Sequence, residues 1–122
     1  MSTGFSSRDL ACYFAAMPDT LDRLFATIAT RKGADAGQSY TAQLLAAGVE
    51  KCARKFGEEA TETVIAAIQK DKTELAKESA DVLYHLLVLW AASGITPEDV
   101  YAVLKAREGR SGLDEKASRS KG

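Results

Sequence analysis

The sequence predicts a single-domain, all-α protein, and three observations support this fold class. Apolar residues recur at steps of three and four along most of the 122-residue chain, no segment shows the apolar–polar alternation of a strand, and only two prolines occur. Hydrophobic residues make up 46% of the chain, which is enough to form a core that needs no disulfide or metal ion to stabilise it. We therefore expect one helical domain and not a two-domain enzyme.

Helix start and stop signals predict five helices. Asp19 follows a proline and is a suitable cap for the first helix, Ser39 for the second, and Thr96 for the last. Asp71, followed three residues later by Glu74, resembles a capping box. The expected helical ranges are 19–31, 39–48, 49–70, 71–94 and 96–108. We expect residues 1–17 to form an N-terminal extension, 18–108 the all-α domain, and 109–122 a polar C-terminal tail.

Charge and cysteine content exclude several classes of protein. Sixteen basic and seventeen acidic residues give a net charge of -1 with no polybasic run, so we expect no nucleic-acid partner and no membrane partner. The longest apolar run is shorter than the roughly 20 residues that span a bilayer. No secretory signal is visible in residues 1–17, so we expect a cytoplasmic location. With Cys12 and Cys52 far apart and His85 the only histidine, a zinc site is not expected.

Two acidic stripes are predicted on the two longest helices. Because the helical period is about 3.6 residues, residues three and four apart share one side of a helix. The stripe on helix 49–70 holds Glu58, Glu59 and Glu62, and that on helix 71–94 holds Glu74, Glu78, Asp81 and His85.

A short connection near residue 70 predicts that these two helices form an antiparallel hairpin. Residues whose numbers sum to about 140 then lie level, given equal rise along both helices. This register pairs Glu62 with Glu78 and Glu59 with Asp81. Carboxylates from both helices should therefore converge.

Converging carboxylates need a compensating cation, because removing an ionised carboxylate from water is costly. Oxygen ligands favour a hard ion, Mg²⁺ or Mn²⁺. The alternative is a solvated acidic face with contacts along each helix, but Glu78 and Asp81 interrupt an otherwise apolar helix. A di-iron site is disfavoured because Val82, and not a glutamate, lies three residues before His85.

Cations precede the acidic residues on helix 49–70. Lys51 and Lys55 lie on the same arc as Glu58, and lysines beside a metal site suit phosphate oxygens. The alternative is pairing along the helix. His85 either contacts a substrate group, supports the metal from outside its ligand set, or is simply a packing residue.

Several segments resemble the phosphoribosyl-ATP pyrophosphohydrolase family of histidine biosynthesis. The two principal ones are VEKCARKFGEEATE at 49–62 and ESADVLYHLLV at 78–88. Three more are SYTAQL at 39–44, EDV at 98–100 and SGLDEKASR at 111–119. The resemblance extends over about residues 20–119. The wider MazG-like group of all-α nucleotide pyrophosphohydrolases shares the carboxylate pattern, whereas SYT and the tail are more specific to this family.

The resemblance implies Mg²⁺-dependent hydrolysis of phosphoribosyl-ATP to phosphoribosyl-AMP and pyrophosphate by a helical homodimer. The apolar residues around Trp90, which cover nearly all sides of their helix, also favour a dimer. Glu59 and Glu62 are then the candidate catalytic groups. The expected metal ligands are Glu58, Glu62, Glu78 and Asp81. The residues expected to balance phosphate charge are Lys51, Arg54, Lys55, Arg110 and Lys116.

The tail carries a hypothesis of its own. Arg110 and Lys116 belong to a basic segment with few core residues, which we expect to fold over the phosphoribosyl end of the substrate and to discriminate against ATP; a disordered tail is the alternative. Two other functions stay open. One is a housecleaning nucleoside triphosphate pyrophosphohydrolase, and the other is a non-catalytic helical interaction module.

Overall fold

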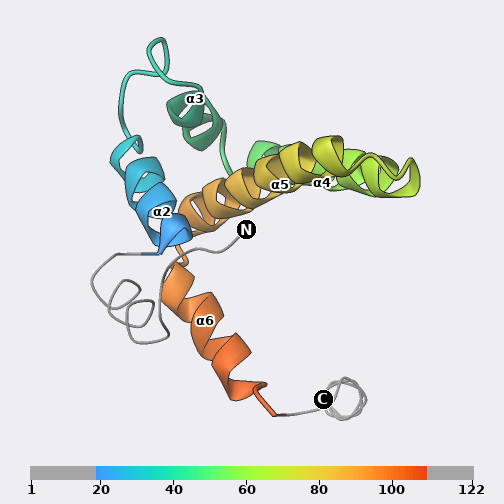
Figure 1. Cartoon of the computed structure of the whole chain (residues 1–122). Helices are drawn as coiled ribbons and strands as arrows, with labels where there is room; N and C mark the ends of the chain where they lie inside the picture. The colour runs from blue at the N-terminus through green and yellow to red at the C-terminus, as the bar shows by residue number, and fades with distance from the viewer. Residues whose placement is uncertain (1–18, 110–122) are drawn as a thin grey trace, which may run out of the picture.

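The computed structural model describes residues 19–109. Its helices are α2 (Thr20–Thr30), α3 (Tyr40–Ala47), α4 (Val49–Ile68), α5 (Lys72–Ser93) and α6 (Pro97–Ala106), shown in Figure 1. No strand occurs within this range, so the all-α prediction is confirmed. The expected extension at 1–17 lies outside the described residues, as does the tail beyond Gly109.

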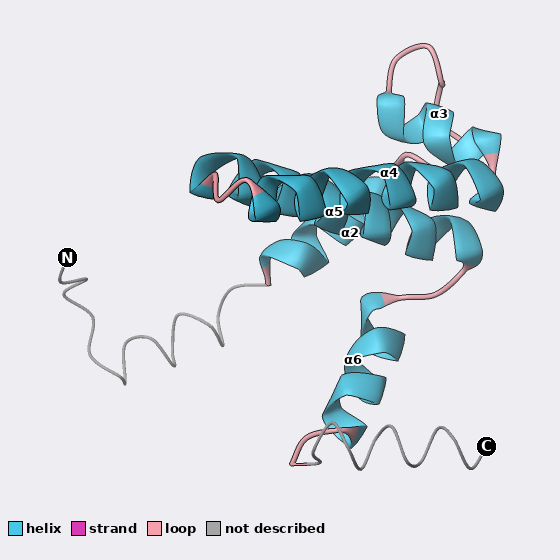
Figure 2. Cartoon of the chain, turned by 90° about the vertical axis from the view of Figure 1, so that its right-hand side faces the viewer, coloured by secondary structure: helices cyan, strands magenta, loops and turns pink. Residues whose placement is uncertain are grey.

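The α4–α5 hairpin is the centre of the fold. These two helices share the most extensive contact, α2 packs along α5, and α3 contacts both helices of the hairpin. Figure 2 shows α4 and α5 side by side, with α3 above them and α6 leading away. The core between them is formed by Ile28, Leu44, Cys52, Leu87, Val88 and Ala91.

The hairpin turn is closed by backbone hydrogen bonds. The amide of Asp71 donates to the carbonyl of Ala66 at 3.3 Å, and that of Lys70 to Ala67 at 3.1 Å. This pattern is a Schellman motif, which places its penultimate residue in the left-handed region. That residue is Lys70, with φ 60°, where a glycine is usual.

The predicted capping box at the start of α5 is half formed. The Asp71 side chain accepts from the Glu74 amide at 3.0 Å. The reciprocal bond is not made, because the amide of Asp71 already donates to Ala66 within the turn. A complete capping box occurs instead at the start of α6, between Thr96 and Asp99.

A side-chain hydrogen bond joins helix α6 to α2. The hydroxyl of Tyr101 donates to the Asp22 carboxylate of α2 at 3.1 Å. Burial and this carboxylate raise the pKa of Tyr101 to about 12, so the phenol keeps its proton. Val103 and Leu104 of the same helix are exposed.

Cys52 is a buried free thiol. Its Sγ donates to the Leu44 carbonyl at 3.2 Å, and burial raises its pKa. Cys12 lies outside the described residues.

Among the described residues, no single helix is both long and apolar enough to cross a membrane. Helices α5 and α6 meet that test of length and composition only as a pair, with a bend of 107° between them.

Lys70→Gly should stabilise the protein, because glycine adopts the left-handed backbone without the steric cost that a side chain carries there. We expect the free energy of unfolding to rise by about 0.5–1 kcal/mol in urea denaturation. The matched control is the end of α5, where Gly94 occupies the same region with φ 79°. Gly94→Ala should lower the free energy of unfolding by a similar amount; a loss of stability in both variants would contradict this account of the turn.

Candidate functional site

The hairpin brings three carboxylates together. Glu59 of α4 and Glu78 and Asp81 of α5 each offer an oxygen atom, and these atoms lie within 4.8 Å of one another. Glu59 and Glu78 are partly buried, whereas Asp81 is exposed. We call these three residues the acidic cluster. Its geometry fits the predicted register, in which Glu59 lies level with Asp81.

Glu62 and Glu74 adjoin the acidic cluster. The side chain of Glu62 interacts with both Glu59 and Glu78, which agrees with its predicted place opposite Glu78. Glu74 also contacts Glu78 from one turn earlier on α5. The sequence-predicted convergence of carboxylates from both helices is therefore present.

Burial and like charge together perturb the carboxyl groups of the acidic cluster. Burial, followed by the neighbouring carboxyl groups, raises the pKa of Glu78 to about 7. The same two causes raise the pKa of Glu59. In addition, Oε2 of Glu78 is buried and has no hydrogen-bond partner among the described residues. A buried acceptor of this kind is costly unless it is paired, so the donor set fits a bound divalent cation.

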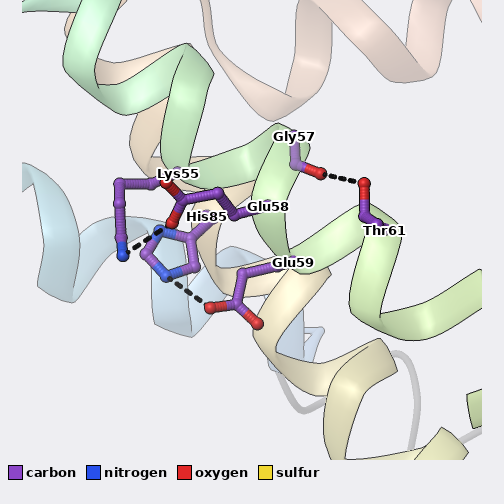
Figure 3. Close-up of polar contacts among 6 residues, drawn as sticks. All are labelled: Lys55, Gly57, Glu58, Glu59, Thr61 and His85. Atoms are coloured by element: carbon purple, nitrogen blue, oxygen red, sulfur yellow. Dashed lines mark hydrogen bonds and ion pairs between the residues drawn. The ribbon is translucent and has the colours of Figure 1, made fainter. Parts of the chain in front are cut away.

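Glu58, which was expected to be a metal ligand, lies elsewhere. Its Oε2 is 3.0 Å from Nζ of Lys55 in an ion pair, and its side chain is 60% exposed. This lysine holds the pKa of Glu58 below its usual value. In Figure 3, Glu58 reaches toward Lys55 while Glu59 reaches toward His85. Glu59 therefore lies in the position that was expected for Glu58. The two side chains point in different directions because adjacent residues are about 100° apart around a helix.

His85 borders the acidic cluster from inside the core. Its Nε2 is 4.0 Å from Oε1 of Glu59, and its side chain is 7% exposed. The imidazole lies edge-on to the rings of Tyr84 and Tyr40, with ring centres 5.0 Å and 6.3 Å away. Burial lowers the pKa of His85. The packing role considered for His85 is therefore observed, together with a contact to Glu59. A role toward a metal or a substrate stays a prediction.

A pocket of about 360 Å³ lies between α3 and α4. Lys51 and Lys55, both predicted to meet phosphate, line one side of it. The α3 side was not assigned a role from the sequence, although SYTAQL was part of the family resemblance and could have indicated it. The α3 residues of the pocket are Tyr40, Gln43, Leu44 and Ala47.

Arg54, also predicted to bind phosphate, is exposed on α4 and does not line this pocket. Arg110 and Lys116 lie outside the described residues.

Comparison with known proteins identifies the family. The sequence model described as phosphoribosyl-ATP pyrophosphohydrolase matches residues 21–108. The chain belongs to this family. A phosphoribosyl-ATP pyrophosphatase of Parvibaculum lavamentivorans is 66% identical over 105 residues, which cover 86% of this chain and 96% of the relative. A Cereibacter sphaeroides protein of the same name is 61% identical over 99 residues, which cover 81% of this chain and 96% of the relative. A third relative of this name, from Paramagnetospirillum magneticum, is 58% identical over 101 residues, which cover 83% of this chain and 93% of the relative.

Removing one negative charge from the acidic cluster should stabilise the metal-free protein and, at the same time, weaken its stabilisation by a bound metal ion. We expect Glu78→Gln to raise the melting temperature of the metal-free protein, because the neutral amide relieves repulsion and desolvation. Saturating Mg²⁺ should raise the melting temperature of the wild type, since a ligand at 100 times its Kd adds about 2.7 kcal/mol. It should raise that of Glu78→Gln much less. Glu58→Gln serves as the control and should respond to Mg²⁺ as the wild type does; an equal response in all three proteins would refute the site.

Proposed function

We propose that this chain hydrolyses phosphoribosyl-ATP to phosphoribosyl-AMP and pyrophosphate as an enzyme of histidine biosynthesis. The observation that carries the proposal is the acidic cluster with its unpartnered Glu78 oxygen. The chain belongs to the phosphoribosyl-ATP pyrophosphohydrolase family, and a hydrolase of phosphoanhydrides uses a bound cation. The acidic cluster supplies the oxygen ligands that such a cation prefers. High identity to three enzymes named for this reaction supports the same substrate.

The cation that we propose is Mg²⁺, with Mn²⁺ as a substitute, held by Glu59, Glu78 and Asp81. This set revises the ligand set expected from the sequence, because Glu58 is paired with Lys55. Glu62, the other expected ligand, lies next to the cluster and interacts with two of its members. A bound divalent ion polarises the phosphate bridge and makes a water molecule more acidic.

The chain's own residues then have separate roles. Glu62 is exposed beside the cluster, where it can orient the attacking water and accept its proton. His85 limits the movement of Glu59 by facing Oε1 from the core. Lys55 precedes Glu59 by about one helical turn and lies on the same side of α4, so that its charge can offset the charge on the departing pyrophosphate.

A homodimer in the cytoplasm is the proposed state of the enzyme. Large apolar side chains are exposed on the hairpin, which favours burial against a second copy. They are Val64, Ile65 and Ile68 of α4 and Leu83 of α5. The net charge of -1 supports the absence of a nucleic-acid or anionic-membrane partner.

Asp81→Asn and Glu62→Gln should each lower kcat/KM for phosphoribosyl-ATP by at least ~10²-fold, the usual scale for loss of one preorganised catalytic charge. The measurement is steady-state release of pyrophosphate with Mg²⁺ present. Glu98→Gln is the matched control, because Glu98 is exposed at the start of α6.

The same assay, run with a panel of nucleoside triphosphates, tests the proposed substrate. Faster turnover of ordinary or damaged triphosphates would indicate a housecleaning enzyme. No turnover of any substrate, with or without Mg²⁺, would indicate a non-catalytic module.

The C-terminal tail is proposed to supply further cations, Arg110 and Lys116, to the phosphoribosyl end of the substrate. Truncation after Gly109 should then raise KM for phosphoribosyl-ATP more than it lowers kcat, because charge-assisted contacts in the bound state are lost. Thermal unfolding of the truncated chain controls for loss of folding. An unchanged KM would remove the tail from the proposal.

A further inference from the structure

We propose that the pocket between α3 and α4 holds the phosphoribosyl group of the substrate, and that Lys51 pairs with its phosphate. This inference rests on the proposed function and deepens it, because the phosphoribosyl group is what distinguishes the substrate from ATP. Three features carry the inference: the distance between Lys51 and the acidic cluster, the chemistry of the pocket walls, and the rigidity of α3.

The position of Lys51 excludes the pyrophosphate end of the substrate as its partner. Eight residues separate Lys51 from Glu59, which corresponds to about 12 Å along the helix. The phosphoanhydride bridge that is cleaved must lie at the acidic cluster. The pyrophosphate beyond that bridge is too short to extend over two helical turns, although it can reach Lys55. A group bound at Lys51 must therefore belong to the nucleoside side of the substrate.

The pocket walls suit a phosphorylated sugar. A volume of about 360 Å³ is within the range of pockets that hold organic ligands. Tyr40, which is 51% exposed, and Ala47 provide an aromatic and apolar wall, and the Gln43 amide can hydrogen-bond sugar hydroxyls. Of the two lysines in the pocket, Lys55 is nearer to the acidic cluster and pairs with Glu58. The ammonium of Lys51 has no ion pair or hydrogen bond within residues 19–109, so it is available for a phosphate.

Contacts with the rest of the fold hold α3 in place. The Ser39 side chain accepts from the Ala42 amide at 3.2 Å and caps the helix. The hydroxyl groups of Thr41 and Tyr84 are hydrogen-bonded to each other and tie α3 to α5. The pocket wall is therefore preorganised, which reduces the entropic cost of ordering it around a ligand. ATP, without the phosphoribosyl group, leaves Lys51 and Gln43 without partners and gains nothing from this wall.

Lys51→Met tests the assignment in the full-length enzyme, because methionine keeps the length of the stem and removes the charge. We expect KM for phosphoribosyl-ATP to rise about tenfold or more, as for loss of a hydrogen bond to a charged group, with a smaller change in kcat. The inhibition constant of ATP, measured as a competing ligand, should stay unchanged. Lys77→Met is the matched control on the exposed side of α5 and should alter neither constant.

Two outcomes of this experiment would overturn the inference. Equal weakening of phosphoribosyl-ATP and ATP would assign Lys51 to the triphosphate. No change in either constant would show that Lys51 does not contact the substrate. In both cases hydrolysis of phosphoribosyl-ATP by the wild type would leave the proposed function intact.

Binding of ribose 5-phosphate gives a second readout that does not depend on catalysis or metal. With EDTA present, we expect it to shift the backbone amide resonances of Gln43 and Ala47, and ribose alone to shift them much less. Lys51→Met should abolish the shifts. Absence of shifts in the wild type would refute the pocket assignment. A wild type that binds ribose 5-phosphate but does not hydrolyse phosphoribosyl-ATP would instead overturn the proposed function.

Discussion

The close approach of like-charged carboxylates across the α4–α5 hairpin is the constraint on which the rest of this structure depends. The extensive contact between the two helices holds Glu59, Glu78 and Asp81 together against their mutual repulsion. Burial of Leu87 and Val88 on the core side of α5 fixes the orientation of that helix. The fold thus stores an unfavourable arrangement of charge that a bound cation relieves, as expected for a site selected for function and not for stability.

Local rules explain why much of this arrangement could be predicted from the sequence. Capping by Asp19, Ser39 and Thr96, and the end of α5 at Gly94, depend on a few adjacent residues. Glu59 and Asp81 lie at the same height along the hairpin, and this follows from the position of the turn and the helical rise alone. The expected fold class and the expected convergence of carboxylates needed nothing further.

Competition between partners explains what the sequence did not predict. Glu58 and Glu59 are adjacent residues of the same type, and only the packing of α4 against α5 decides that Glu59 faces the cluster while Glu58 meets Lys55. The half-formed capping box at Asp71 has a similar origin, because the turn had already used its amide. The pocket depends on the placement of α3, which is tied to α5 by a pair of hydroxyl groups 43 positions apart in sequence.

The distribution of charge along α4 is opposed to helix stability and suited to a phosphate-rich ligand. Lys51, Arg54 and Lys55 lie in the N-terminal half of the helix. Lys51 is in the first turn, where the macrodipole favours anions, so this cation adds unfavourably to the positive end of the helix. Glu50 in the first turn and Glu58, which pairs with Lys55, offset the three cations in part. The acidic cluster begins one turn later and binds positive charge. A substrate that is itself anionic and carries a divalent cation is complementary to both halves at once, whereas a simple anion or a bare cation matches only one of them.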